Sequence, residues 1–180
     1  MTDKLNEALQ NVEMTYGELV EIANSITKPI FEPIDDIVKD VSSRINSMPI
    51  DMIRDTMLDL QIKAFEIAET KEKAALKAEL AEALQKEKFA VSFTGSDGTA
   101  ALKDKLAQLA TSEETLTEAM YNLVANLFKT KLDQCHRLVD CLKSILMSRM
   151  QETKFMSVGT DAEIPPTKRM ALNEDCKNQF

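Results

Sequence analysis

The sequence is poor in the residues that build β-sheets, tight turns and metal sites. Its 180 residues include no Trp, two Tyr, four Gly and a single histidine, His136. Strands are enriched in aromatic residues and hairpin turns depend on Gly, so this composition disfavours a β-rich fold. No apolar run is long enough to span a membrane, and no apolar signal-peptide core precedes the first helical pattern. We therefore expect a cytoplasmic protein with no membrane segment.

The three cysteines do not form a catalytic or metal-binding motif. Cys135, Cys141 and Cys176 contain no CxxC pair, and His136 is the only histidine beside them. On a helix, Cys135 and His136 would point about 100° apart, so they cannot act together as nucleophile and base. An odd number of cysteines without a pattern is typical of a reducing compartment. We expect no enzyme activity, no metal site and no cofactor.

Two long runs without Gly or Pro dominate the chain instead. Residues 50–91 and 113–150 carry apolar side chains at helical spacing, which predicts two helices of roughly 55 to 65 Å. The predicted packing seam of the first run comprises Ile50, Ile53, Met57, Leu60, Ala64 and Ile67. The predicted stripe of the second comprises Leu116, Met120, Leu123, Leu127, Leu132, Cys135, Val139, Leu142 and Leu146. The sequence therefore predicts an all-α fold, an elongated helical or coiled-coil bundle in which a Gly-containing loop and a short helix join the two long helices.

Proline and glycine set further expected boundaries. Pro29 should end a first helix, and Pro33 can open a short second one. Residues 92–99 hold two Gly and predict a loop, and Val91 and Phe93 beside it are compatible with a short strand.

A short helix and a capping motif should follow that loop. Leu102, Leu106 and Leu109 have the spacing of a helix of about three turns. Thr111 and Glu114 have the spacing of a capping box, in which each side chain bonds the backbone N–H of the other. This motif predicts the start of the last long helix.

Charge is unevenly distributed along the chain. The net charge is −8, and residues 1–62 hold 5 Lys/Arg against 12 Asp/Glu, whereas residues 129–154 hold 6 against 3. The last residues are polar and include Pro165-Pro166 without periodicity, which is typical of disorder. We therefore expect an acidic helical region at 1–47, a long-helix core domain at 48–157 and a disordered tail at 158–180.

Lysines cluster in the second half of the first long run. Lys73 and Lys77 are four residues apart and share a helix face, with acidic residues interleaved. The plain interpretation is a solvated face with ion pairs one turn apart. The alternative is that oligomerisation aligns several copies of these lysines in a phosphate-binding groove. The candidate nucleic-acid-binding residues are Lys71, Lys73, Lys77, Lys86, Lys88, Lys143 and Arg149.

The lysine-rich run resembles a known family. The segment KEKAALKAELAEALQ, with Leu76, Lys77, Ala78 and then Leu80, is similar to the Lys-rich helix of phage recombination mediators of the UvsY type.

The order of the following elements is similar as well. Gly95 and Gly98 match a Gly-containing loop that comes next in the family. The stretch from Lys143 to Ser148-Arg149 resembles the end of its later long helix, which carries a Ser-Arg pair. The similarity covers residues 60–150 in the order of elements.

The resemblance implies a non-enzymatic DNA-binding accessory protein. The family binds single-stranded DNA, assembles into rings and loads a recombinase onto DNA coated by a single-strand-binding protein. By this resemblance the chain is an oligomeric recombination mediator of a phage or mobile element, acting in DNA recombination and repair in the host cytoplasm. A recombinase and a single-strand-binding protein are the further partners it implies. Lys77 would contact the DNA backbone, with Lys71 and Lys73 beside it.

Two other functions fit the same residues. The coiled-coil stripes and overall acidity also fit a helical structural or assembly protein, such as a scaffold or virion component. The acidic front, Glu13 to Asp59, fits an inhibitor or regulator that binds a basic surface of a host protein. For the fold itself we expect self-association into a ring or bundle, because the apolar stripes exceed what one short N-terminal helix could cover.

Overall fold

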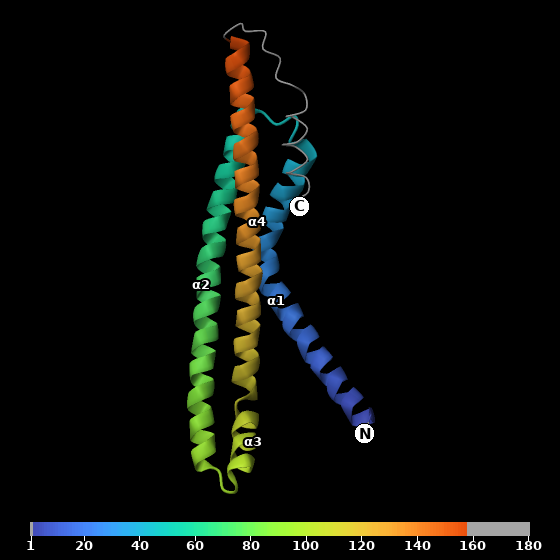
Figure 1. Cartoon of the computed structure of the whole chain (residues 1–180), viewed down its shortest axis with the longest axis vertical. Coiled ribbons are helices and arrows are strands. Elements are labelled where there is room, and N and C mark those ends of the chain that lie inside the picture. Colours follow the sequence, from blue (N-terminus) through green and yellow to red (C-terminus); the bar gives the residue numbers. More distant parts are fainter. Residues whose placement is uncertain (1, 158–180) are drawn as a thin grey trace. The chain divides into compact units, whose positions relative to one another are not determined.

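Residues 2–157 form four α-helices that follow one another along the chain (Figure 1). The computed structural model describes the backbone of residues 2–157 and the side chains of residues 16–154; the predicted tail lies outside them. The helices are α1 (Thr2–Arg44), α2 (Ile50–Gly95), α3 (Ala100–Ala110) and α4 (Ser112–Ser157). No strand occurs among the described residues, so the all-α fold is confirmed. α2 and α4 are the two long helices that the sequence predicts, and a loop and the short α3 join them.

The helices contribute to two compact units. Unit 1 combines the chain up to Pro29 with Glu69–Lys129, and unit 2 combines Ile30–Ala68 with the chain from Thr130 onward. Each unit therefore holds one segment of α1, one of α2 and one of α4, and unit 1 also holds α3. The expected division at residues 47 and 157 followed charge along the chain and stays a prediction.

Unit 2 has an aliphatic core. Its buried apolar side chains are Ile34, Val41, Ile45, Met48, Ile53, Leu60, Ala64, Ile67, Cys135, Leu138, Val139, Leu142 and Ile145. Four of the six predicted seam residues of α2 are among them. The chain reverses between α1 and α2, where the N–H groups of Ser47 and Met48 both bond the carbonyl of Arg44. Pro49 then precedes the first residue of α2, where the fixed φ of proline and its missing N–H suit the start of a helix.

The core of unit 1 consists of small side chains apart from Val124 and Phe128 of α4. Its buried residues are Ala23, Thr27, Ala74, Ala78, Ala81, Ala107, Thr111, Val124 and Phe128. In this part of α4 the predicted stripe was offset, because Val124 and Phe128 are buried whereas Leu123 and Leu127 are half-buried. Periodicity alone cannot choose between two neighbouring helix faces when both are apolar.

α1 continues through both prolines, where the sequence predicted two separate helices. Pro29 and Pro33 each remove a backbone N–H donor, which destabilises a helix. The helix persists because side chains on either side of the prolines are buried: Ala23 and Thr27 in unit 1, and Ile34 in unit 2. Burial against other helices thus outweighs local propensity here.

α2 runs farther than the sequence predicted, so the suggestion of a short strand was wrong. Val91 and Phe93 lie inside the helix. The ring of Phe93 stacks on that of Phe89 one turn earlier, with 6.1 Å between the ring centroids. Pairs of this spacing stabilise a helix, which explains why the β-forming residues remain helical. The loop shortens to residues 96–99.

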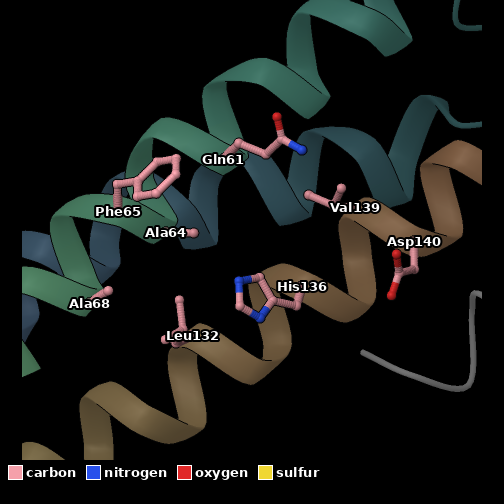
Figure 2. Close-up of a pocket in the computed structure, with 8 residues that line it drawn as sticks. All are labelled: Gln61, Ala64, Phe65, Ala68, Leu132, His136, Val139 and Asp140. Atoms are coloured by element: carbon pink, nitrogen blue, oxygen red, sulfur yellow. The ribbon is translucent and has the colours of Figure 1, made fainter.

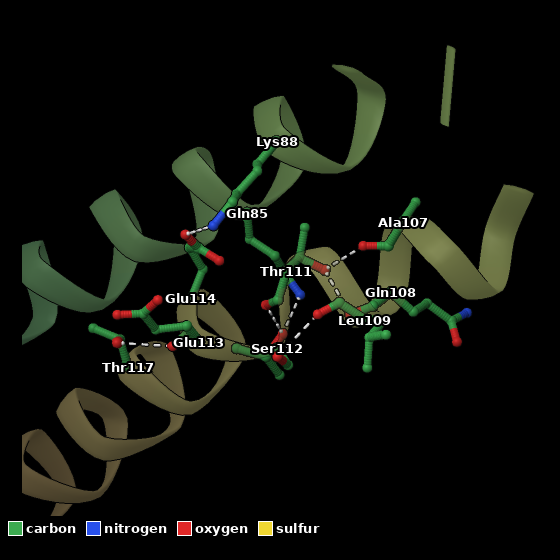
Figure 3. Close-up of polar contacts among 11 residues, drawn as sticks. Gln85, Lys88, Ala107, Gln108, Leu109, Thr111, Ser112, Glu113, Glu114 and Thr117 are labelled. Atoms are coloured by element: carbon green, nitrogen blue, oxygen red, sulfur yellow. Dashed lines mark hydrogen bonds and ion pairs between the residues drawn. The ribbon is translucent and has the colours of Figure 1, made fainter. Parts of the chain in front are cut away.

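The predicted capping box at the start of α4 was also wrong. α3 ends only one residue before α4 begins, and the backbone N–H of Thr111 already bonds the carbonyls of Ala107 and Gln108. The Thr111 hydroxyl donates to the same two carbonyls, at 3.1 and 3.2 Å (Figure 3). The carboxylate of Glu114 instead accepts a hydrogen bond from Lys88 of α2.

Gly98 and Gly95 provide a matched test of the α2–α3 loop. Gly98 has a φ of 121°, and an added Cβ would lie 2.8 Å from Cδ2 of Leu102. We expect Gly98→Ala to lower the free energy of unfolding by about 1–2 kcal/mol, because side chains disfavour this backbone conformation. Gly95 is helical and has open space around it, so Gly95→Ala should be neutral or slightly stabilising. Urea unfolding followed by circular dichroism measures both; equal effects would contradict this account of the loop.

Candidate functional site

Four of the five candidate lysines of α2 are ion-paired within unit 1. Each ammonium contacts a carboxylate oxygen at most one helical turn away or on the adjacent helix. The pairs are Lys71–Glu72, Lys73–Glu69, Lys86–Glu82 and Lys88–Glu114. Exposed pairs of this kind add little stability, but each carboxylate offsets a positive charge that a phosphate would otherwise neutralise. The arrangement matches the plain interpretation of an ion-paired helix face.

Lys77 is the exception among these lysines. Its side chain is exposed and makes no ion pair with a described residue; its Nζ lies 5.0 Å from the centroid of the Tyr121 ring on α4. A lysine over an aromatic face is held by a cation–π interaction, in which no carboxylate offsets its charge. Lys77 and the half-buried Tyr121 therefore combine a cation with an aromatic ring on the surface of unit 1.

The two remaining candidates, Lys143 and Arg149, belong to unit 2 and differ from each other. Lys143 is exposed and has no carboxylate partner among the described residues. The guanidinium of Arg149 donates hydrogen bonds to the backbone carbonyls of Ile45 and Met48. These carbonyls lie just after α1, where a helix leaves acceptors without an internal partner. Arg149 thus stabilises the connection between α1 and α2.

Lys88 of α2 and Glu114 of α4 form an ion pair in unit 1. Their Nζ and Oε1 atoms are 2.7 Å apart, and Gln85 donates a hydrogen bond of 2.8 Å to the hydroxyl of Thr115 beside them (Figure 3). The hydrogen bond from Lys88 lowers the pKa of Glu114, and the same bond raises the pKa of Lys88. The contact ties the end of α2 to the start of α4.

A leucine face runs along the same part of α2. We define it as Leu76, Leu80 and Leu84, whose side chains are 63%, 60% and 49% exposed. The alanines at 74, 78 and 81 are buried on another side of the helix. This arrangement is the reverse of that in an ordinary amphipathic helix, in which leucine packs inward and small or polar residues face water.

Unit 2 contains an open pocket between α2 and α4, with a volume of about 680 Å³. Figure 2 shows its lining: α2 contributes Gln61, Ala64, Phe65 and Ala68, and α4 contributes Leu132, His136, Val139 and Asp140. The imidazole of His136 points toward α2, and Asp140 lies one turn farther along α4. The lining is mostly apolar, with three polar side chains: Gln61, His136 and Asp140.

The thiol of Cys135, the residue before this histidine, is not positioned to act as a nucleophile. Cys135 is free and buried in the core of unit 2, and burial raises the pKa of its thiol. A raised pKa disfavours the thiolate, which is the nucleophilic form. Nearby, the buried Lys131 pairs with Asp35, and its ammonium lies 5.1 Å from the centroid of the Phe31 ring. These contacts explain how a lysine is accommodated in the core of unit 2.

No group of three or more His, Cys, Asp or Glu residues that could hold a metal ion occurs among the described residues. None of the helices within residues 2–157 is long and apolar enough to cross a membrane.

Comparison with known proteins found no matching family, no similar curated protein and no similar solved structure.

The side of α2 that packs in this stretch is the feature that periodicity did not identify. Leu76, Leu80 and Leu84 are its only large apolar residues, and by themselves they indicate a thin hydrophobic face that projects from the main packing or packs at its edge. The signal for the opposite arrangement was the row of alanines at 74, 78 and 81, which has its own helical spacing. The two rows lie on different sides of the helix, the alanines buried and the leucines exposed.

The Lys88–Glu114 contact predicts a specific pH dependence of stability. The pKa of Glu114 is lower in the folded protein than its ordinary value of 4.5, so the contact stabilises the fold above that range and loses its contribution as pH falls through the folded-state pKa. We expect Glu114→Gln to be destabilising near neutral pH and to approach the wild type in acid. Urea unfolding between neutral pH and pH values below about 4 measures this.

Glu113→Gln is the control, because it removes the same charge from the adjacent, exposed position. Glu113 makes no ion pair among the described residues, so its stability difference from the wild type should change less over the same range than that of Glu114→Gln. A pH-independent effect of Glu114→Gln would show that the ion pair is not the cause.

Proposed function

We propose that this chain is a non-catalytic helical assembly protein that self-associates through the leucine face of unit 1. The observation that carries the proposal is the exposure of Leu76, Leu80 and Leu84 on a helix that buries only alanines in its own unit. A leucine side chain gains about 1.5–3 kcal/mol when it passes from water into a packed interface. A row of three such side chains on a rigid helix is a typical helix–helix docking surface.

The lack of a catalytic arrangement among the described residues is compatible with this proposal. Burial of Cys135 disfavours its thiolate, and His136 and Asp140 line a mostly apolar pocket. In this proposal the protein acts through contacts at its surface.

Disruption of the leucine face tests the proposal. We expect the wild-type chain to sediment as an oligomer at micromolar concentration, and Leu76→Lys/Leu84→Lys to sediment near the monomer mass of 20.2 kDa. Both side chains are exposed in the single chain, so helicity by circular dichroism should be unchanged. Leu58→Lys, at a position 57% exposed in unit 2, is the control and should remain oligomeric. A wild-type monomer at 100 micromolar would refute self-association.

A second candidate is single-stranded DNA binding by the assembled protein, the function that the family resemblance implies. The observation that favours it is the pairing of the exposed Lys77 with Tyr121, since single-strand binders combine cations with aromatic rings on which bases stack. The ion pairs of Lys71, Lys73 and Lys86 weigh against a broad phosphate-binding face. A recombination mediator would use only a few free cations, Lys77 and Lys143 among them.

Fluorescence anisotropy with a labelled single strand and the matching duplex tests this candidate across a salt series. If it is correct, binding to the single strand weakens steeply with salt, and Lys77→Glu weakens it by about tenfold or more. Lys86→Glu is the control, because Lys86 already shares its charge with Glu82 and lies outside the leucine face, so it should matter less. Absence of binding at low salt and tens of micromolar protein would exclude DNA binding by this protein alone.

A further inference from the structure

The charges around the leucine face are arranged symmetrically about its central residue. Lys73 and Glu87 each lie seven residues from Leu80, one on either side, and Leu76 and Leu84 each lie four residues away. At about 100° per residue, Lys73 and Glu87 sit only about 20° from the direction of Leu80, on opposite sides of it. Along one line of α2, the face therefore carries a basic residue, then three leucines, then an acidic residue.

We propose that the occupant of this face is the same face of a second copy, in an antiparallel arrangement centred on Leu80. This inference rests on the proposed function and specifies its geometry. A two-fold axis at Leu80 would place Leu80 opposite Leu80, and Leu76 at the height of Leu84 of the other copy. It would also bring each Lys73 opposite the other copy's Glu87. Such a pairing is isologous and closes with two copies.

The charges favour the antiparallel pairing of two copies over a parallel one. A parallel pairing in register would stack the leucines equally well, but it would place Lys73 against Lys73 and Glu87 against Glu87. Like charges that face each other across a helix interface disfavour that pairing. The antiparallel pairing converts the same four side chains into two opposite-charge contacts.

The charged residues are available for this pairing in the single chain. Glu87 is exposed and makes no ion pair with any described residue. Lys73 contacts Glu69 at 2.6 Å, but both side chains are about two-thirds exposed, so this contact can be exchanged at little cost. The opposite side of α2 is occupied by the buried alanines, so a second copy can bind without displacing the core of unit 1.

A charge-reversal cycle in the full chain tests the arrangement. In sedimentation equilibrium, Lys73→Glu and Glu87→Lys should each raise the dimer dissociation constant by about tenfold, since each creates two like-charge contacts. The double variant Lys73→Glu/Glu87→Lys restores opposite charges and should return to within about threefold of the wild type. Lys105→Glu, an exposed position on α3 with the same charge change as Lys73→Glu, is the matched control and should have no effect.

The outcomes separate this inference from the proposed function. A wild-type protein that remains monomeric overturns both. Assembly that depends on Leu76 and Leu84 but is unchanged by either single reversal keeps the proposed function and overturns the antiparallel arrangement. A double variant that assembles more weakly than both single variants also overturns it. Circular dichroism of each variant establishes that the helices are intact, so a loss of assembly cannot be attributed to unfolding.

Discussion

The alanine seam of α2 is the constraint on which the rest of unit 1 depends. Ala74, Ala78 and Ala81 occupy the buried side of the helix, and short side chains allow neighbouring helix backbones to approach closely. Such a seam buries little apolar area per residue, since each alanine contributes one methyl group. The larger side chains of the same helix, Leu76 and Leu80 among them, are consequently left in water. Unit 1 therefore has a small core and an apolar surface, a combination that favours association.

The ion pairs of α2 follow from the same geometry. With alanines inward and leucines outward, the remaining positions flank the leucine face, and they are filled by lysine and glutamate one turn apart. These residues favour the helix by propensity and by pairing. They also keep the flanks hydrated, which would limit the proposed association to the leucine face. The lysines thus suit a face that directs helix pairing better than one that binds phosphate, with Lys77 over Tyr121 as the exception.

The sequence predicted the fold class and the long helices because both depend on signals that extend over many residues. The seam of Ile53, Leu60 and Ile67 was predicted for the same reason, since its spacing is unambiguous. Local signals were less reliable. Pro29 did not end α1, because burial on either side outweighed the lost hydrogen bond, and Thr111 could not form a capping box because the preceding helix already used its N–H. Ion pairing of Lys88 with Glu114 depends on the packing of two helices and leaves no pattern in the sequence.

The symmetry of the leucine face limits what this surface alone can build. An isologous contact uses the same residues on both copies and is complete with two, so it cannot by itself form a ring of several subunits. A larger assembly requires a second, different contact. α3 supplies a candidate surface, since Leu102, Leu106 and Leu109 are 49%, 42% and 73% exposed while only Ala107 of that helix is buried. α3 therefore repeats the pattern of α2, with alanine inward and leucine outward, and the two faces together would allow dimers to be joined into higher assemblies.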